Sequence, residues 1–151
     1  MESCSSGLKG KRAFTLIELL IVIVILSILL AIGIKYYREW KLRNDVETSI
    51  KALYAEIQYQ RNKAFIEKKP VKIEVNGKEA VITTPASTTT LKLSAPFSGT
   101  LTIDSKGIFD SGSIVFTGDL KLSPSVSCII ANKVRLRLGK TVEKSGKRVC
   151  E

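Results

Sequence analysis

The pattern of apolar and polar positions divides the chain into three parts, and the first part is almost entirely apolar. Between Phe14 and Ile34 the chain carries one charged residue, Glu18. As an α-helix this range would span roughly 31 Å at about 1.5 Å per residue, which matches a bilayer hydrocarbon core of about 30 Å. We therefore predict that this segment forms a membrane-spanning helix.

The second part shows the period of an amphipathic helix. After Tyr37, apolar residues recur at steps of three or four positions, with one step of seven. This spacing places them on one face of an α-helix. The helix should end near Glu67, because Pro70 disfavours helical geometry in the residue before it. The apolar positions are Leu42, Val46, Ile50, Leu53, Ile57 and Ala64. The pattern predicts one continuous helix of about 50 residues, apolar all round in its first half and amphipathic in its second.

The third part, beyond Pro70, alternates with a period of two and predicts β-strands. Val71–Val75 alternates apolar and polar residues, Asn76-Gly77 is a strong hairpin signal, and Lys78–Thr83 would be the partner strand. Residues 82–90 read as a polar loop. Further short strands are expected at Thr90–Ser94, Gly99–Asp104, Ser113–Thr117, Ser125–Ile130 and Lys133–Leu138. The expected fold class is α+β, with a long N-terminal transmembrane and amphipathic helix packed on an antiparallel β-sheet.

Composition narrows the function classes. The chain of 151 residues carries a net charge of +10 and contains no histidine. The absence of histidine weakens acid–base and zinc-site interpretations, and neither a phosphate-binding glycine loop nor a pair of carboxylates at a suggestive spacing is evident. We therefore expect a protein that is not an enzyme, with no catalytic residues, no metal site and no cofactor.

The cations that precede the apolar segment predict its orientation. Lys9, Lys11 and Arg12 should keep the short leader cytoplasmic while the rest of the chain crosses the membrane. A secretory signal peptide is the alternative, since Ala31-Ile32-Gly33 has the small-x-small pattern of a cleavage site. That alternative gives no reason for Glu18, and the helical pattern continues through Gly33 without a boundary.

Residues 11–19, KRAFTLIEL, resemble the signal segment of type IV pilins and pseudopilins. The resemblance implies that prepilin peptidase cuts between Ala13 and Phe14 on the cytoplasmic side, and that the new amine of Phe14 is N-methylated. Glu18 would then be the fifth residue of the mature chain. By resemblance, its carboxylate pairs with the N-terminal amine of a neighbouring subunit during filament assembly. The alternative for Glu18 is a carboxylate that reaches to the membrane interface.

The resemblance also implies a domain organisation and a location. Residues 1–13 would be a cytoplasmic leader peptide, 14–36 the transmembrane half of the helix, 37–68 its amphipathic half, and 69–151 a β-rich soluble domain. The protein would pass once through the bacterial inner membrane, with its C-terminal domain in the periplasm, before it enters a pilus or pseudopilus. Its partners would be prepilin peptidase and other pilin or pseudopilin subunits.

The C-terminal half is similar to GspH/FimT-like minor pilins and pseudopilins. The similarity rests on residues 101–116, LTIDSKGIFDSGSIVF, and 127–139, SCIIANKVRLRLG. Where that family reads Gly-Arg-x-Arg, this chain has Asn132-Lys133-Val134-Arg135. Under this interpretation Cys128 and Cys150 form a disulfide in an oxidising compartment, with free buried thiols as the alternative, and Cys4 is lost with the leader.

A basic C-terminal region suggests an anionic partner. If residues 133–138 form a strand, Lys133, Arg135 and Arg137 share one face about 6.6–7 Å apart, a spacing comparable to that of nucleic-acid phosphates. The resemblance to FimT-like proteins implies DNA binding for uptake. The alternatives are a solvated face, anionic lipid headgroups or acidic partner subunits, and an H-type pseudopilin of type II secretion without DNA binding. The candidate DNA-binding residues are Lys133, Arg135, Arg137, Lys140, Lys144, Lys147 and Arg148.

Overall fold

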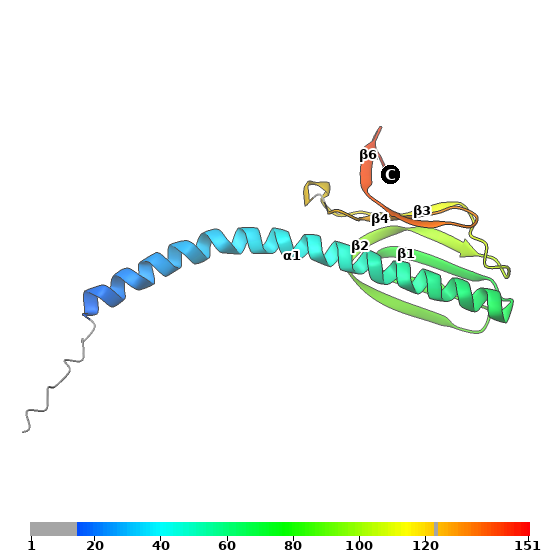
Figure 1. The fold of residues 1–151 in the computed structure, drawn as a ribbon, viewed down its shortest axis with the longest axis horizontal. Coiled ribbons are helices and arrows are strands. Elements are labelled where there is room, and N and C mark those ends of the chain that lie inside the picture. The colour runs from blue at the N-terminus through cyan, green and yellow to red at the C-terminus, as the bar shows by residue number, and fades with distance from the viewer. Residues whose placement is uncertain (1–14, 123) are drawn as a thin grey trace, which may run out of the picture. The chain divides into compact units, whose positions relative to one another are not determined.

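The computed structural model describes residues 15–122 and 124–151, and it has the expected α+β fold. A single long helix, α1 (Leu16–Glu67), is followed by an antiparallel β-sheet (Figure 1). The chain forms two compact units, which divide between Tyr37 and Arg38. The sheet and the second half of α1 belong to the unit Arg38–Glu151.

Helix α1 begins and ends where local signals place its ends. Thr15 accepts hydrogen bonds at its carbonyl from the backbone N–H groups of Glu18 and Leu19, at 3.1 and 3.2 Å. At the other end, Lys68 adopts a left-handed conformation with φ 56° immediately after Glu67. Such a residue stops the helical hydrogen-bond ladder, and Pro70 prevents it from resuming. The predicted end at Glu67 is confirmed.

Five strands form the main sheet, in the order β1-β2-β3-β4-β5, and every neighbouring pair is antiparallel. A short 3-10 helix, η1 (Leu120–Leu122), connects β3 to β4. A separate two-stranded sheet pairs β6 (Thr141–Lys144) with β7 (Lys147–Cys150). The five strands of the main sheet are β1 (Val71–Thr83), β2 (Thr88–Ile103), β3 (Gly112–Phe116), β4 (Cys128–Ala131) and β5 (Leu136–Gly139).

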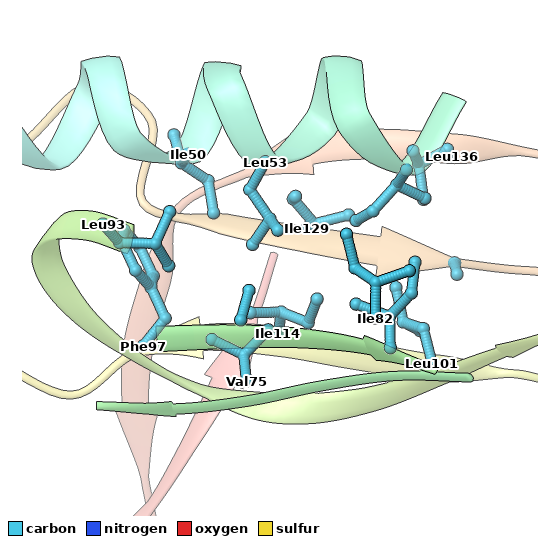
Figure 2. Packing of buried hydrophobic residues seen from close by; sticks show 14 of the residues in the cluster. Ile50, Leu53, Val75, Ile82, Leu93, Phe97, Leu101, Ile114, Ile129 and Leu136 are labelled. Carbon is cyan, nitrogen blue, oxygen red and sulfur yellow. The ribbon is translucent and has the colours of Figure 1, made fainter. Parts of the chain in front are cut away.

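The hydrophobic core lies between one face of the second half of α1 and the main sheet (Figure 2). Five of the six predicted helix positions are buried there, from Val46 to Ala64. The prediction was wrong for Leu42, which is 50% exposed. Helical periodicity identifies the face but not the point along it where other elements begin to cover it. Gln60 is buried within the seven-position step between Ile57 and Ala64.

The predicted hairpin at Asn76-Gly77 was also wrong. The chain continues through both residues within β1, and Gly77, with φ 64°, lies where the pairing of β1 with β2 shifts register. A bulge and a two-residue turn both move the buried positions from odd to even numbers, so the apolar pattern suits either. The long partner strand β2 decides between them, because it pairs with both halves of β1. The two strands predicted at Thr90–Ser94 and Gly99–Asp104 are accordingly one strand.

The turn between β1 and β2 lies instead inside the segment that had been predicted as a polar loop. The hydroxyl of Thr84 accepts a hydrogen bond from the backbone N–H of Ser87 at 3.0 Å, and Thr84 N–H donates to the carbonyl of Ser87 at 2.8 Å. Pro85 occupies the second turn position, for which its φ is suited. These side-chain contacts make a compact turn, so Thr88 already starts β2.

A second tight turn corrects the strand predicted at Lys133–Leu138. Asn132 and Arg135 exchange two backbone hydrogen bonds, of 2.9 and 3.0 Å, and thereby close a hairpin between β4 and β5. Strand β5 therefore starts at Leu136. The β6–β7 hairpin was not predicted from the sequence; its turn contains Ser145 and Gly146, both with positive φ. The runs around this turn are too short and too polar to show a period.

Candidate functional site

The first candidate site is the apolar half of α1. Every residue from Leu16 to Ile34 is exposed, and the large apolar side chains there are between 45% and 83% exposed. The helix is long and apolar enough to cross a membrane, with a mean hydropathy of 3.1 in its most apolar window, and none of that window is buried. An apolar surface of this extent marks a region that lipid or other protein chains cover.

Glu18 lies in the first turn of this apolar helix. Its backbone N–H donates to the hydroxyl of Thr15 at 3.3 Å, which makes Thr15 the N-cap. The spacing Thr15-x-x-Glu18 is that of a capping box, and an acidic residue in the first turn also interacts favourably with the helix dipole. This local role was not predicted from the sequence, although the spacing alone indicates it.

The predicted cleavage site cannot be placed. Ala13 and Phe14 lie outside the described residues, and so do the predicted N-methylation position and the leader. The described chain begins at Thr15, immediately after them.

The seven predicted DNA-binding residues do not form one row. Lys133 lies in the tight turn and Arg135 closes it, so only Arg137 lies within β5. The prediction that these three residues share one face of a strand was therefore wrong, because the first half of the predicted strand forms the turn. Lys140 follows β5, and the remaining three, Lys144, Lys147 and Arg148, belong to the β6–β7 hairpin.

Two cations of the hairpin are engaged within the fold. The guanidinium of the half-buried Arg148 donates to the carbonyl of Phe116 at 2.9 Å. The ammonium group of Lys144 forms an ion pair with Glu151. Arg148 thus holds the hairpin against β3. Its guanidinium contributes to packing within the fold rather than to an exposed basic surface.

The disulfide expected from the resemblance is present between Cys128 and Cys150, whose Cα atoms are 5.8 Å apart. Cys128 and Ile129 are neighbours in β4, so their side chains point to opposite faces of the sheet. Because Ile129 belongs to the core cluster, the disulfide lies on the face away from the core. The buried Thr141 adds to this attachment: its N–H donates to the Ser127 hydroxyl at 2.8 Å, and its hydroxyl accepts from Phe116 N–H at 3.2 Å. The β6–β7 hairpin is therefore anchored both covalently and by buried hydrogen bonds.

The exposed cations of the β4–β5 turn lie close to a loop that follows β2. The carbonyl of Lys133 accepts a hydrogen bond from Phe109 N–H at 3.0 Å, and the carbonyl of Gly107 accepts from Arg61 Nε at 2.9 Å. Arg61 also lies over the Phe109 ring at 5.1 Å. These contacts join the last turns of α1, the loop and the turn at one end of the sheet. We call three exposed cations of the loop and the turn, Lys106, Lys133 and Arg135, the basic end.

Comparison with known proteins identifies the N-terminal segment. A family profile described as the prokaryotic N-terminal methylation motif matches residues 8–34. No curated protein and no solved structure shows significant similarity to the chain. The matched motif supports a type IV pilin-like protein, and it implies processing by prepilin peptidase and assembly with other pilins. Together with the apolar helix it fits a membrane-anchored protein.

Proposed function

We propose that the chain is a minor pilin or pseudopilin subunit of a filament of the type IV pilus or type II secretion kind. The observation that carries the proposal is the exposed apolar half of α1, which lies within the matched methylation motif. The same helix surface would face lipid before assembly and other subunits afterwards. In this proposal prepilin peptidase cuts between Ala13 and Phe14, Phe14 is N-methylated, and the unit Arg38–Glu151 lies in the periplasm. The chain itself has no catalytic role.

Glu18 has a defined task in the proposed assembly. Within a filament its carboxylate pairs with the free amine of Phe14 of a neighbouring subunit. An ionised carboxylate surrounded by apolar helices is unfavourable unless it has a partner, so correctly aligned neighbours are favoured over misaligned ones. The ion pair therefore sets the alignment of the subunits, while the exposed apolar side chains supply most of the packing.

The test compares two substitutions in the first turn of α1. Glu18→Leu should insert into the membrane and be processed normally, yet the sheared filament fraction should lack it. Thr15→Ala is the matched control, because it removes the N-cap hydroxyl, with a cost of about 1 kcal/mol, and leaves the carboxylate in place. It should still assemble. Normal assembly of Glu18→Leu, or equal loss in both variants, would overturn the role given to the ion pair.

DNA binding is the second candidate function. It is favoured by the hydrogen bond from Phe109 N–H to the Lys133 carbonyl, which joins the loop that carries Lys106 to the turn that carries Lys133 and Arg135. Three exposed cations from two segments can contact successive phosphates without reading sequence. Asp104 and Asp110 in the same loop reduce the net charge, which argues for weak, salt-sensitive binding. The alternative is an H-type pseudopilin of type II secretion that does not bind DNA.

A gel-shift with the mature chain in detergent distinguishes these functions. The variant K106A/K133A/R135A should bind duplex DNA much more weakly, and its salt slope should fall by about 0.9 per lost phosphate contact. The matched control K140A/K144A/K147A removes the same charge from the segment after β5 and should retain binding. Loss in the control alone would move the site to the hairpin. No retardation of the unmodified chain at low salt would remove DNA binding altogether.

A further inference from the structure

Three aromatic residues follow the apolar half of α1 and remain exposed. Tyr36, Tyr37 and Trp40 are 70%, 60% and 62% exposed, and none belongs to the hydrophobic core. The buried stripe of the helix begins only at Val46. These three large aromatic side chains therefore lie outside the buried core.

The surrounding residues are those of a membrane–water interface. Tyrosine and tryptophan are enriched at this level of a bilayer, where an apolar ring and a polar N–H or O–H group are both accommodated. Around them on α1 lie four exposed cations whose aliphatic stems can follow the lipid while their charges reach the phosphates. These cations are Lys35, Arg38, Lys41 and Arg43.

The spacing along α1 relates this aromatic segment to Glu18. From Glu18 to Tyr36 the helix rises about 27 Å, at about 1.5 Å per residue. The hydrocarbon core of a bilayer is about 30 Å thick. If the aromatic residues lie at one boundary of the core, Glu18 lies at the other.

We propose that Tyr36, Tyr37 and Trp40 form a belt that binds the phospholipid headgroup layer and sets the depth of the helix, so that Glu18 lies in the opposite headgroup layer. The proposal rests on the membrane anchor of the proposed function. It adds that the carboxylate stays in contact with water before assembly. Glu18 becomes surrounded by apolar groups only when the subunit leaves the bilayer for the filament, which is also when an amine partner is present.

The belt can be tested directly, because Trp40 is the only tryptophan of the chain. The full chain is reconstituted into phosphatidylcholine–phosphatidylglycerol vesicles that contain lipids brominated either near the headgroup or near the bilayer centre. Trp40 emission should be blue-shifted, and the shallow bromine should quench it at least about twofold more strongly than the deep one. Stronger quenching by the deep bromine, or water-like emission without quenching, overturns the belt.

Flotation of the same vesicles separates this inference from the anchor. A chain that floats with the vesicles but lacks shallow quenching contradicts the belt and leaves the anchor intact. A chain that does not float contradicts both. The two outcomes are read from one sample, so they cannot be confused.

The depth of Glu18 is tested with single cysteines that leave the carboxylate in place. In a Cys4→Ser background with the native disulfide intact, Ile17→Cys and Ile25→Cys differ only in their distance from the end of the apolar segment. A water-soluble maleimide should label the first at least about tenfold faster, because Ile25 lies near the centre of the hydrocarbon core. Equal labelling rates would overturn the placement of Glu18.

Discussion

The two halves of α1 differ in whether their apolar side chains are buried. From Val46 to Ala64 a single stripe is buried against the sheet, and the other faces are polar or exposed. From Leu16 to Ile34 the residues are exposed on every side. A helix with one apolar stripe can be completed by its own domain, whereas a helix that is apolar all round requires a surrounding medium or several partner chains. One continuous element thus serves folding in one half and insertion or assembly in the other.

The two halves should differ most in their response to an added charge. Leu26→Asp should reduce membrane insertion by about 3–4 kcal/mol, because a carboxylate would lie near the middle of the apolar segment. Thr48→Asp, at an exposed position of the amphipathic half, should leave insertion unchanged. Alkaline extraction of membranes from expressing cells measures both. Stable membrane association of Leu26→Asp would count against a spanning helix.

The next largest effect concerns the core. Leu53 is fully buried, so Leu53→Ala should lower the free energy of unfolding of the domain by about 2–5 kcal/mol. Leu29→Ala removes the same atoms from a side chain that is 60% exposed and should change this free energy little. Urea denaturation in detergent, followed by near-ultraviolet circular dichroism, gives both values. Similar losses in the two variants would mean that the halves are not energetically distinct.

Loss of the covalent attachment of the β6–β7 hairpin should lower the free energy of unfolding slightly less than the largest loss expected for Leu53→Ala. Replacement of Cys128 and Cys150 by alanine opens a loop with a sequence separation of 22. In the chain-entropy description this lowers the free energy of unfolding by about 3 kcal/mol. Denaturation without reductant measures it, and reduction of the unmodified chain should reproduce the loss. A variant as stable as the native chain would show that the buried Thr141 hydrogen bonds hold the hairpin by themselves.

A small gain in the free energy of unfolding is expected from a substitution of Gln60. This polar residue lies in the buried stripe of α1, and among the described residues it is the one whose buried side chain has an atom without a hydrogen-bond partner. Its Nε2 donates to Glu56 Oε1 at 2.8 Å, but its buried Oε1 has no hydrogen-bond partner. Gln60→Met keeps the length of the side chain and removes the unpaired oxygen, so it should raise the free energy of unfolding by about 1 kcal/mol. The same denaturation experiment measures it. Destabilisation instead would indicate a partner, such as a water molecule, for that oxygen.

The elements that sequence predicted well depend on short-range interactions. The extent of α1, its buried stripe and its end at Glu67 follow from helical periodicity and from Pro70. The elements it predicted poorly depend on distant partners. Asn76-Gly77 could have been a turn or a bulge, and the pairing of β1 with β2 decided. For the candidate site the same difference appears: the motif around Glu18 is local, whereas the loop that carries Lys106 meets the turn that carries Lys133 through the hydrogen bond from Phe109 N–H to the Lys133 carbonyl.

Three features follow from local sequence alone: the single long helix, the half of it that is apolar all round, and the place of Glu18 in that half. They do so because each helical hydrogen bond joins residues four apart. The pairing of the strands, the positions of the turns and the exposure of each cation depend instead on tertiary contacts. Strand pairing joins residues far apart in the chain, and a single bulge or turn changes every neighbour that follows. The apolar half of the helix could therefore be recognised from the sequence, while the basic end could not.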